Sequence, residues 1–285
     1  MTLTSVDLKP ASPSVSSIGL LLLGAAAAVL WVGGNIWLPW LAPTGIPSVI
    51  VRLAIHVVIL TGVWLGLRRT DFSASKQVRV WLAIALPFTI WMAVVWYLAV
   101  TGTFHVIPGA ARLPRLPITI FLPLILALLP LLWSRSIGVL LDAMPPSWLI
   151  ALQVYRIFGG IFLVNWLNGS VAGVFAWPAG IGDMATGAMA LPVALAVASG
   201  TANGHRTGLW WNAFGLLDFA VAITMGFLTS PGPFQRFGFD IAISQAGTYP
   251  TVMIPAFAVP SSILLHALSI RQLRRATDRS APRSA

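Results

Sequence analysis

Three ionisable side chains lie inside long apolar stretches in the second half of the chain. Arg156, Asp183 and Asp218 interrupt runs that otherwise consist mostly of aliphatic, aromatic and small residues. A charged side chain in the hydrocarbon of a membrane costs roughly 2.5–3.5 kcal/mol on insertion scales. Such residues persist where they pair with one another, contact water or perform a function. These three therefore define the candidate site.

The depth of each residue within its apolar run predicts which of them meet. Arg156 lies about nine residues, or roughly 13 Å, from the start of its run. Asp218 lies about eleven residues, or roughly 16 Å, into a run that starts on the same side. An ion pair between them near the midplane would lower the cost of both charges. Asp183 lies only about five residues from the opposite side, which predicts a second, outer group with Arg52 and His56.

Three basic residues allow more than one interpretation. Arg52 and His56 are four residues apart and share a helix face, as a polar vestibule would require. Arg52 also lies near the predicted outer end of its span, where an arginine can extend to the lipid headgroups instead. His266 lies near the predicted inner end of the last span. There it fits an ordinary interfacial or hydrogen-bonded residue, or a member of a proton relay.

The polar residues that accompany these charges complete the candidate pathway for a substrate or a proton. Its members are Arg156, Asp218, Asp183, Arg52, His56, Gln153, Tyr155, Asn212 and His266. Small residues recur at helical spacing beside both aspartates and allow close helix packing, which predicts that the carboxylates face the protein interior. The alternative is that the charges only lock neighbouring helices in register.

Composition indicates that lipid surrounds the elements that carry these residues. Of the 285 residues, 58% are hydrophobic and 8% are charged, whereas a soluble domain has about 25% charged residues. A span needs about 20 apolar residues to cross the roughly 30 Å of hydrocarbon. Eight such spans are predicted near 18–41, 47–67, 79–101, 115–134, 147–168, 178–199, 207–229 and 250–270.

The predicted fold is therefore all-α: a polytopic bundle of about eight transmembrane helices in a single domain, 18–270. Its first apolar run is longer than the 7–15 apolar residues of a signal-peptide core, so we expect this run to stay attached as the first span. Basic residues concentrate on the side that holds Arg68, Arg69 and the C-terminal arginines, which predicts that both termini are cytoplasmic. Residues 1–17 form a cytoplasmic segment, and residues 271–285 are predicted to form a basic, disordered tail.

Several classes of function are disfavoured by composition. The net charge of +10 is spread over short connections and forms no compact basic domain, so nucleic acid is not an expected partner. The chain has no Cys and no Glu, which leaves few metal ligands, and no metal or cofactor is predicted. The expected partners are the lipid bilayer and a small-molecule or lipid ligand. Arg-rich, Lys-poor usage resembles that of high-GC bacteria and suggests the plasma (inner) membrane.

Three functions remain open from the sequence. The favoured one is a small-molecule or proton-coupled transporter, which the predicted Arg156–Asp218 pair near the midplane, the polar outer group and the proline-kinked spans all favour. Prolines at 250, 255 and 260 would free backbone carbonyls beside a polar cavity. The second is an intramembrane enzyme that acts on a lipid or isoprenoid substrate, with an aspartate as general acid or base. The third is a non-catalytic subunit or sensor. The 230–248 segment is either a lid or an inert interfacial loop.

Overall fold

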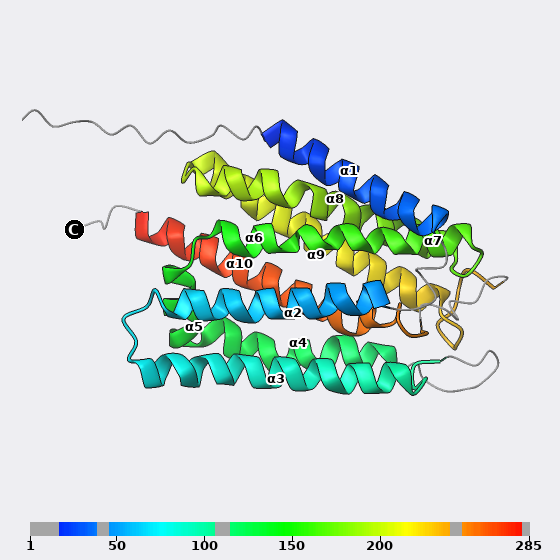
Figure 1. The fold of residues 1–285 in the computed structure, drawn as a ribbon, viewed down its shortest axis with the longest axis horizontal. Coiled ribbons are helices and arrows are strands. Elements are labelled where there is room, and N and C mark those ends of the chain that lie inside the picture. Colours follow the sequence, from blue (N-terminus) through cyan, green and yellow to red (C-terminus); the bar gives the residue numbers. More distant parts are fainter. Residues whose placement is uncertain (1–16, 39–45, 106–114, 240–246, 281–285) are drawn as a thin grey trace, which may run out of the picture.

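The computed structural model describes residues 17–38, 46–105, 115–239 and 247–280, and every element within these ranges is helical (Figure 1). The elements in chain order are α1 Ser17–Trp37, α2 Ile46–Leu67, α3 Ala74–Val100, α4 Leu116–Trp133, α5 Arg135–Ala143, α6 Ser147–Leu152, the 3₁₀-helix η1 Gln153–Gly160, α7 Ile161–Leu167, α8 Gly173–Ala198, α9 Ala202–Thr229, the π-helix η2 Ile254–Ala258 and α10 Val259–Ser280.

Within the described ranges, eight helical stretches are long and apolar enough to cross a membrane. Six are formed by the single helices α1, α2, α3, α4, α8 and α9. The other two are composite: α6, η1 and α7 form the fifth span, and η2 with α10 forms the eighth. The structure thus confirms the prediction of an all-α, polytopic bundle with eight spans.

The fifth and eighth spans form the interior of the bundle. Half of the apolar window of each is buried, compared with 11% for α1 and 17% for α4. Helix α8 packs against α9, η1 and α1, and α10 packs against α4 and α9. In Figure 1, α1 begins and α10 ends at the same end of the bundle, as an even number of spans requires. That this end is cytoplasmic stays a prediction from the basic residues.

Both interior spans depart from α-helical geometry. The fifth span contains eight consecutive 3₁₀ residues, Gln153–Gly160, whereas runs longer than three or four residues are uncommon. The eighth span begins with the five-residue π-helix Ile254–Ala258, which contains Pro255. The absence of an N–H on proline removes one helical hydrogen bond and favours such an irregularity. The two irregular segments line one cavity, which is described below.

Helix α10 continues ten residues beyond the predicted end of the last span, which corrects the prediction of a disordered tail from residue 271. The short helix α5, which the sequence did not reveal, provides its docking surface. Gln272 Nε2 donates to the backbone carbonyls of Leu141 and Met144 at 2.6 and 2.7 Å. Arg275 forms an ion pair with Asp142. These bonds hold the polar turns of α10 in place, while residues 281–285 lie outside the described ranges.

Several helices begin earlier than the apolar pattern predicts. Helix α8 starts at Gly173 and α9 at Ala202, each five residues before the predicted start. Thr201 explains the start of α9, because its hydroxyl accepts a hydrogen bond from the Gly204 amide at 3.1 Å and so caps the helix.

In the 230–248 segment, Phe234, Phe237 and Phe239 are exposed. Residues 240–246 lie outside the described part, as do residues 1–16 of the predicted N-terminal segment.

Candidate functional site

Arg156 stands in the middle of the 3₁₀ segment, against the glycine-bearing face of α8. A Cβ atom at Gly159 would lie 2.2 Å from Oδ2 of Asp183, so only glycine allows the fifth span to approach α8 at this point. Consecutive glycines also weaken the α-helix that the surrounding sequence would otherwise form. The local sequence therefore accounts for a tight contact at which a charged side chain projects from irregular backbone into the bundle.

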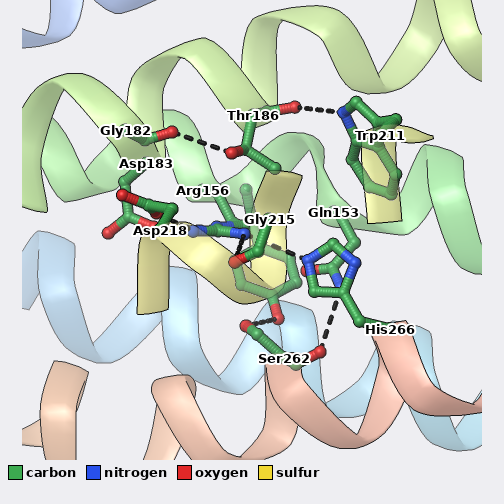
Figure 2. A network of polar contacts seen from close by, with 11 residues as sticks. Gln153, Arg156, Gly182, Asp183, Thr186, Trp211, Gly215, Asp218, Ser262 and His266 are labelled. Atoms are coloured by element: carbon green, nitrogen blue, oxygen red, sulfur yellow. Dashed lines mark hydrogen bonds and ion pairs between the residues drawn. The ribbon is translucent and has the colours of Figure 1, made fainter. Parts of the chain in front are cut away.

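The guanidinium of Arg156 contacts three other helices at once (Figure 2). Its Nε donates to Oδ1 of Asp183 on α8 at 2.7 Å, and its Nη2 forms an ion pair with Oδ2 of Asp218 on α9. Its Nη1 contacts Nε2 of His266 on α10 at 3.0 Å. The guanidinium carbon lies 3.8 Å from the ring centroid of Phe219, so the cation also rests on an aromatic face.

The donor inventory of the site fixes the tautomer of His266. Arginine has only donors, so Nε2 of His266 must accept from Arg156 and the proton must reside on Nδ1. Nδ1 then donates to Oδ1 of Asn212 at 2.8 Å. The amide nitrogen of Asn212 in turn donates to Ser269 Oγ at 3.0 Å. A neutral His266 therefore connects the charged cluster to a buried polar chain between α9 and α10.

A second polar contact joins the fifth span to α10. The hydroxyls of Tyr155 and Ser262 lie 2.5 Å apart, and Gln153 Nε2 donates to the Ser262 carbonyl at 3.2 Å. On the other side, Trp211 Nε1 donates to the Thr186 carbonyl at 3.1 Å and ties α9 to α8. These contacts surround the charged cluster with hydrogen-bonded side chains, so its geometry is held from several directions (Figure 2).

Charge in the cluster does not balance. One guanidinium faces two carboxylates, and all three residues are at most 9% exposed. Each carboxylate uses one oxygen on Arg156. With both aspartates ionised, the buried cluster carries one excess negative charge, which is unfavourable away from water. The cluster is therefore suited to take up one proton or one positively charged group.

A cavity of about 500 Å³ adjoins this cluster. Its wall includes Arg156 and Asp183 from the cluster, and Asn35, Arg52, Asn165, Thr251 and Ser262 among other polar residues. Apolar groups such as Trp31 and Phe158 complete it. Ligand pockets of small-molecule proteins span about 300–1,000 Å³, so the space is large enough for a small organic molecule.

The structure brings together most of the residues singled out in the sequence. Arg156 and Asp218 form the pair that their depths predict. Gln153, Tyr155, Asn212 and His266 lie in the same network. A role of these residues in a substrate or proton pathway stays a prediction.

The predicted outer group of Asp183 with Arg52 and His56 is wrong in its pairing. Asp183 binds Arg156 instead, because α8 starts five residues earlier than predicted and places this residue roughly 7.5 Å deeper. His56 Nε2 contacts Thr89 Oγ1 at 3.0 Å, and its ring stacks on Phe88 between α2 and α3. Arg52 donates to the Pro250 carbonyl at 2.7 Å. Arg52 and Asp183 share only the cavity wall.

The position of His266 also differs from the prediction. The interfacial interpretation is wrong, because the side chain is fully buried against Arg156. The reason is the length of α10, which continues to Ser280 and leaves His266 well inside the bundle. The hydrogen-bonded interpretation agrees with its contacts to Arg156 and Asn212. Ser269 was missed, although its spacing of three residues from His266 places it on the same helix face.

The described residues contain no group of three or more His, Cys, Asp or Glu side chains that could hold a metal ion. The polar groups of the site are instead suited to hydrogen bonding, ion pairing and proton exchange.

Comparison with known proteins adds a family assignment. No curated protein and no solved structure matches the chain. Residues 113–274 match a family described as a domain of unknown function, DUF8737. The match covers more than half of the sequence and runs from α4 into α10, so it includes Arg156, Asp183, Asp218 and His266 but not Arg52. The chain belongs to the DUF8737 family.

Proposed function

We propose that this protein is a membrane transporter that couples movement of a small molecule to uptake and release of a proton by the Arg156–Asp183–Asp218 cluster. The observation that carries the proposal is the sharing of one buried guanidinium by two carboxylates, with Arg156 and Asp183 in the wall of a cavity. Intramembrane ionisable groups of this kind commonly form proton relays or substrate pathways.

The excess carboxylate provides the coupling site. When neither aspartate carries a proton, both compete for Arg156 and the buried cluster is negatively charged. Protonation of one aspartate removes that charge and weakens its bond to the guanidinium, because a neutral acid accepts a weaker hydrogen bond than a carboxylate. The two aspartates lie on different helices, so a change of proton state alters the attachment of α8 or α9 to the fifth span.

Irregular backbone beside the cavity supports the same function. Non-helical backbone occurs at membrane depth where it is buried in protein or lines a cavity. Secondary transporters place their substrate sites at such interrupted helices. Here η1 contributes Tyr155, Arg156 and Phe158 to the cavity wall, and η2 contributes Ile254 and Ala258. Both interrupted spans therefore border one space.

The proposal is tested with purified protein in liposomes that contain a pH-sensitive dye. A panel of radiolabelled organic acids, amino acids, sugars, nucleosides and polyamines is screened for uptake driven by an imposed pH gradient. Asp218→Asn and Asp183→Asn are compared with Asp71→Asn, which alters an exposed acid in the α2–α3 connection. We expect the site variants to lose proton-coupled uptake while the control keeps it. Uptake with an unchanged pH dependence in both site variants would show that the mechanism is wrong.

A second function is favoured by a different cavity. Asp183 also borders an apolar space of about 80 Å³, lined by Phe162, Phe175, Phe219 and neighbouring aliphatic residues. An apolar chain there would place a lipid or isoprenoid substrate beside a carboxylate that could act as a general acid or base. Deletion of the gene should then cause a lipid precursor to accumulate. An unchanged lipid profile together with proton-coupled uptake in liposomes would favour transport.

A further inference from the structure

Arg52 is a buried cation in the second span. Only 8% of the residue is exposed, so the protein encloses its side chain. Its Nη2 donates to the Pro250 carbonyl at 2.7 Å, while its Nη1 has no hydrogen-bond partner. Among the described residues, no acidic side chain forms an ion pair with it.

An arginine in this position calls for a negatively charged partner. Its guanidinium keeps its charge in proteins, and a buried charge without a counter-charge costs several kcal/mol. A backbone carbonyl offers only a partial charge in return. The five N–H donors of arginine match the planar or tetrahedral oxygen groups of carboxylates and phosphates. The environment of Arg52 is therefore incomplete without an anion.

The location of Arg52 shows where that anion would lie. Arg52 is part of the wall of the 500 Å³ cavity, together with Asn165 from α7. The amide nitrogen of Asn165 is also buried and lacks an acceptor. Two cavity residues thus carry unused donors, and an oxygen-rich ligand would supply acceptors for both. Trp31, Ile55 and Phe158 offer apolar surface in the same space.

We propose that the cavity binds a small organic anion, a carboxylate or a phosphate ester. Its oxygens accept hydrogen bonds from Arg52 and Asn165, and its apolar body contacts the aromatic wall. Both a free metabolite and an anionic lipid can carry such a carboxylate or phosphate group. The coupling described next rests on the proposed transport function, whereas the binding site itself does not.

Proton and anion would stabilise each other's binding in this arrangement. Asp183 lines the same cavity as Arg52, so its negative charge repels an anion at any place within that space. Protonation of the cluster removes this repulsion. The titratable and charged groups that face Asp183 or the cavity are Arg156 and Tyr155 from the fifth span, Asp218 from α9, His266 from α10, Arg52 from α2 and Tyr249. Anion affinity should therefore increase as the pH falls.

The test uses aromatic ligands of similar size and different charge. Benzoate and phenyl phosphate are the anionic probes, benzyl alcohol is the neutral one and benzylamine the cationic one. Binding to the purified full-length protein is measured by calorimetry and by thermal stabilisation. The measurements are repeated in phosphatidylcholine nanodiscs with and without phosphatidylglycerol. Arg52→Gln and Asn165→Leu are compared with Arg68→Gln, which removes an exposed arginine at the other end of α2.

We expect saturable binding of an anionic probe, or stabilisation by phosphatidylglycerol, that weakens by about tenfold or more in Arg52→Gln. Arg68→Gln should bind as the wild type does. Free-probe binding in phosphatidylcholine identifies a soluble anion, and an effect of phosphatidylglycerol alone identifies a lipid. If Arg52→Gln does not fold, Arg52→Lys provides the comparison, because it keeps the charge but loses the two-pronged contact and should weaken binding less.

Other outcomes would overturn the anion site. Binding of benzylamine that depends on Asp183, no anion binding at all, or anion binding unaffected at Arg52 would each do so. These results leave the transporter proposal standing, because the proton-flux experiment with Asp218→Asn does not involve Arg52. Conversely, Arg52-dependent anion binding without any proton-coupled flux would support the site and reject the transport function.

Discussion

Gly182 and Asp218 lie so close that a Cβ atom at residue 182 would be 1.7 Å from Oδ1 of the aspartate. The contact joins α8 to α9 at the level of Arg156, and only a residue without a side chain can occupy the position. The small residues that recur along α8 therefore do more than allow helices to pack. At this point the glycine provides the space for a buried carboxylate that pairs with Arg156.

Gly182→Ala should displace Asp218 from Arg156 because backbone and side chain cannot both stay in place. We expect loss of thermal stability in detergent and loss of any proton-coupled flux. Gly62→Ala is the matched control, since a Cβ atom there meets nothing within 4 Å. Equal thermal stability and equal flux in the two variants would contradict the close contact between Gly182 and Asp218.

Neutralisation of the aspartates should have a strongly non-additive effect on stability. Asp183→Asn or Asp218→Asn alone removes the excess negative charge and leaves Arg156 one ionic partner, so each single variant should keep or gain stability. The double variant leaves a buried cation unpaired, which costs about 3–5 kcal/mol. A double-mutant cycle, measured by reversible unfolding in mixed micelles, gives the coupling free energy between the two aspartates. Additive effects would show that the two carboxylates do not share the guanidinium.

The imidazole of His266 should be neutral with its proton on Nδ1 at pH 7. Nitrogen NMR of histidine-labelled protein distinguishes this tautomer from the Nε2–H form and from the cation. The chain has four histidines, and His266→Gln identifies the relevant signal by its disappearance. A signal of the Nε2–H tautomer or of imidazolium would contradict the assigned direction of the Arg156–His266 bond.

The docking of α10 on α5 should depend more on Gln272 than on Arg275. Gln272 is 2% exposed, and its loss leaves two carbonyls without their donor, at a cost of about 1–3 kcal/mol. The Arg275–Asp142 pair is partly exposed to solvent, and such pairs contribute roughly 0–1 kcal/mol. Gln272→Leu should therefore lower the melting temperature more than Arg275→Gln. The reverse order would show that the ion pair dominates.

Membrane orientation can be tested at the two ends of α3. The chain contains no Cys, so single cysteines at the exposed residues Ser73 and Thr101 can be labelled without background. The distribution of basic residues predicts that Ser73→Cys reacts only after the cytoplasmic side is opened and that Thr101→Cys reacts in intact cells. Labelling with the opposite preference would invert the topology.

Much of the fold could be predicted because hydrophobic runs of sufficient length have few alternatives in a membrane. The meeting of Arg156 with Asp218 also followed from simple depth. The place of Asp183 did not, because the first turns of α8 contain Trp177 and Pro178 and look like a boundary, whereas the helix begins at Gly173. His266 was misplaced for a related reason. Gln272 and Arg275, near the end of α10, bond to α5 and the residue after it, and no local pattern reveals this contact between distant segments.

Arg156 is attached by separate nitrogen atoms to α8, α9 and α10, while its own backbone belongs to a fourth, irregular span. Relative sliding of any two of these helices must stretch or exchange at least one of the three attachments. The guanidinium is therefore a junction between these helices. Under the proposed transport mechanism, the aspartate that receives a proton would determine which helix is released from Arg156.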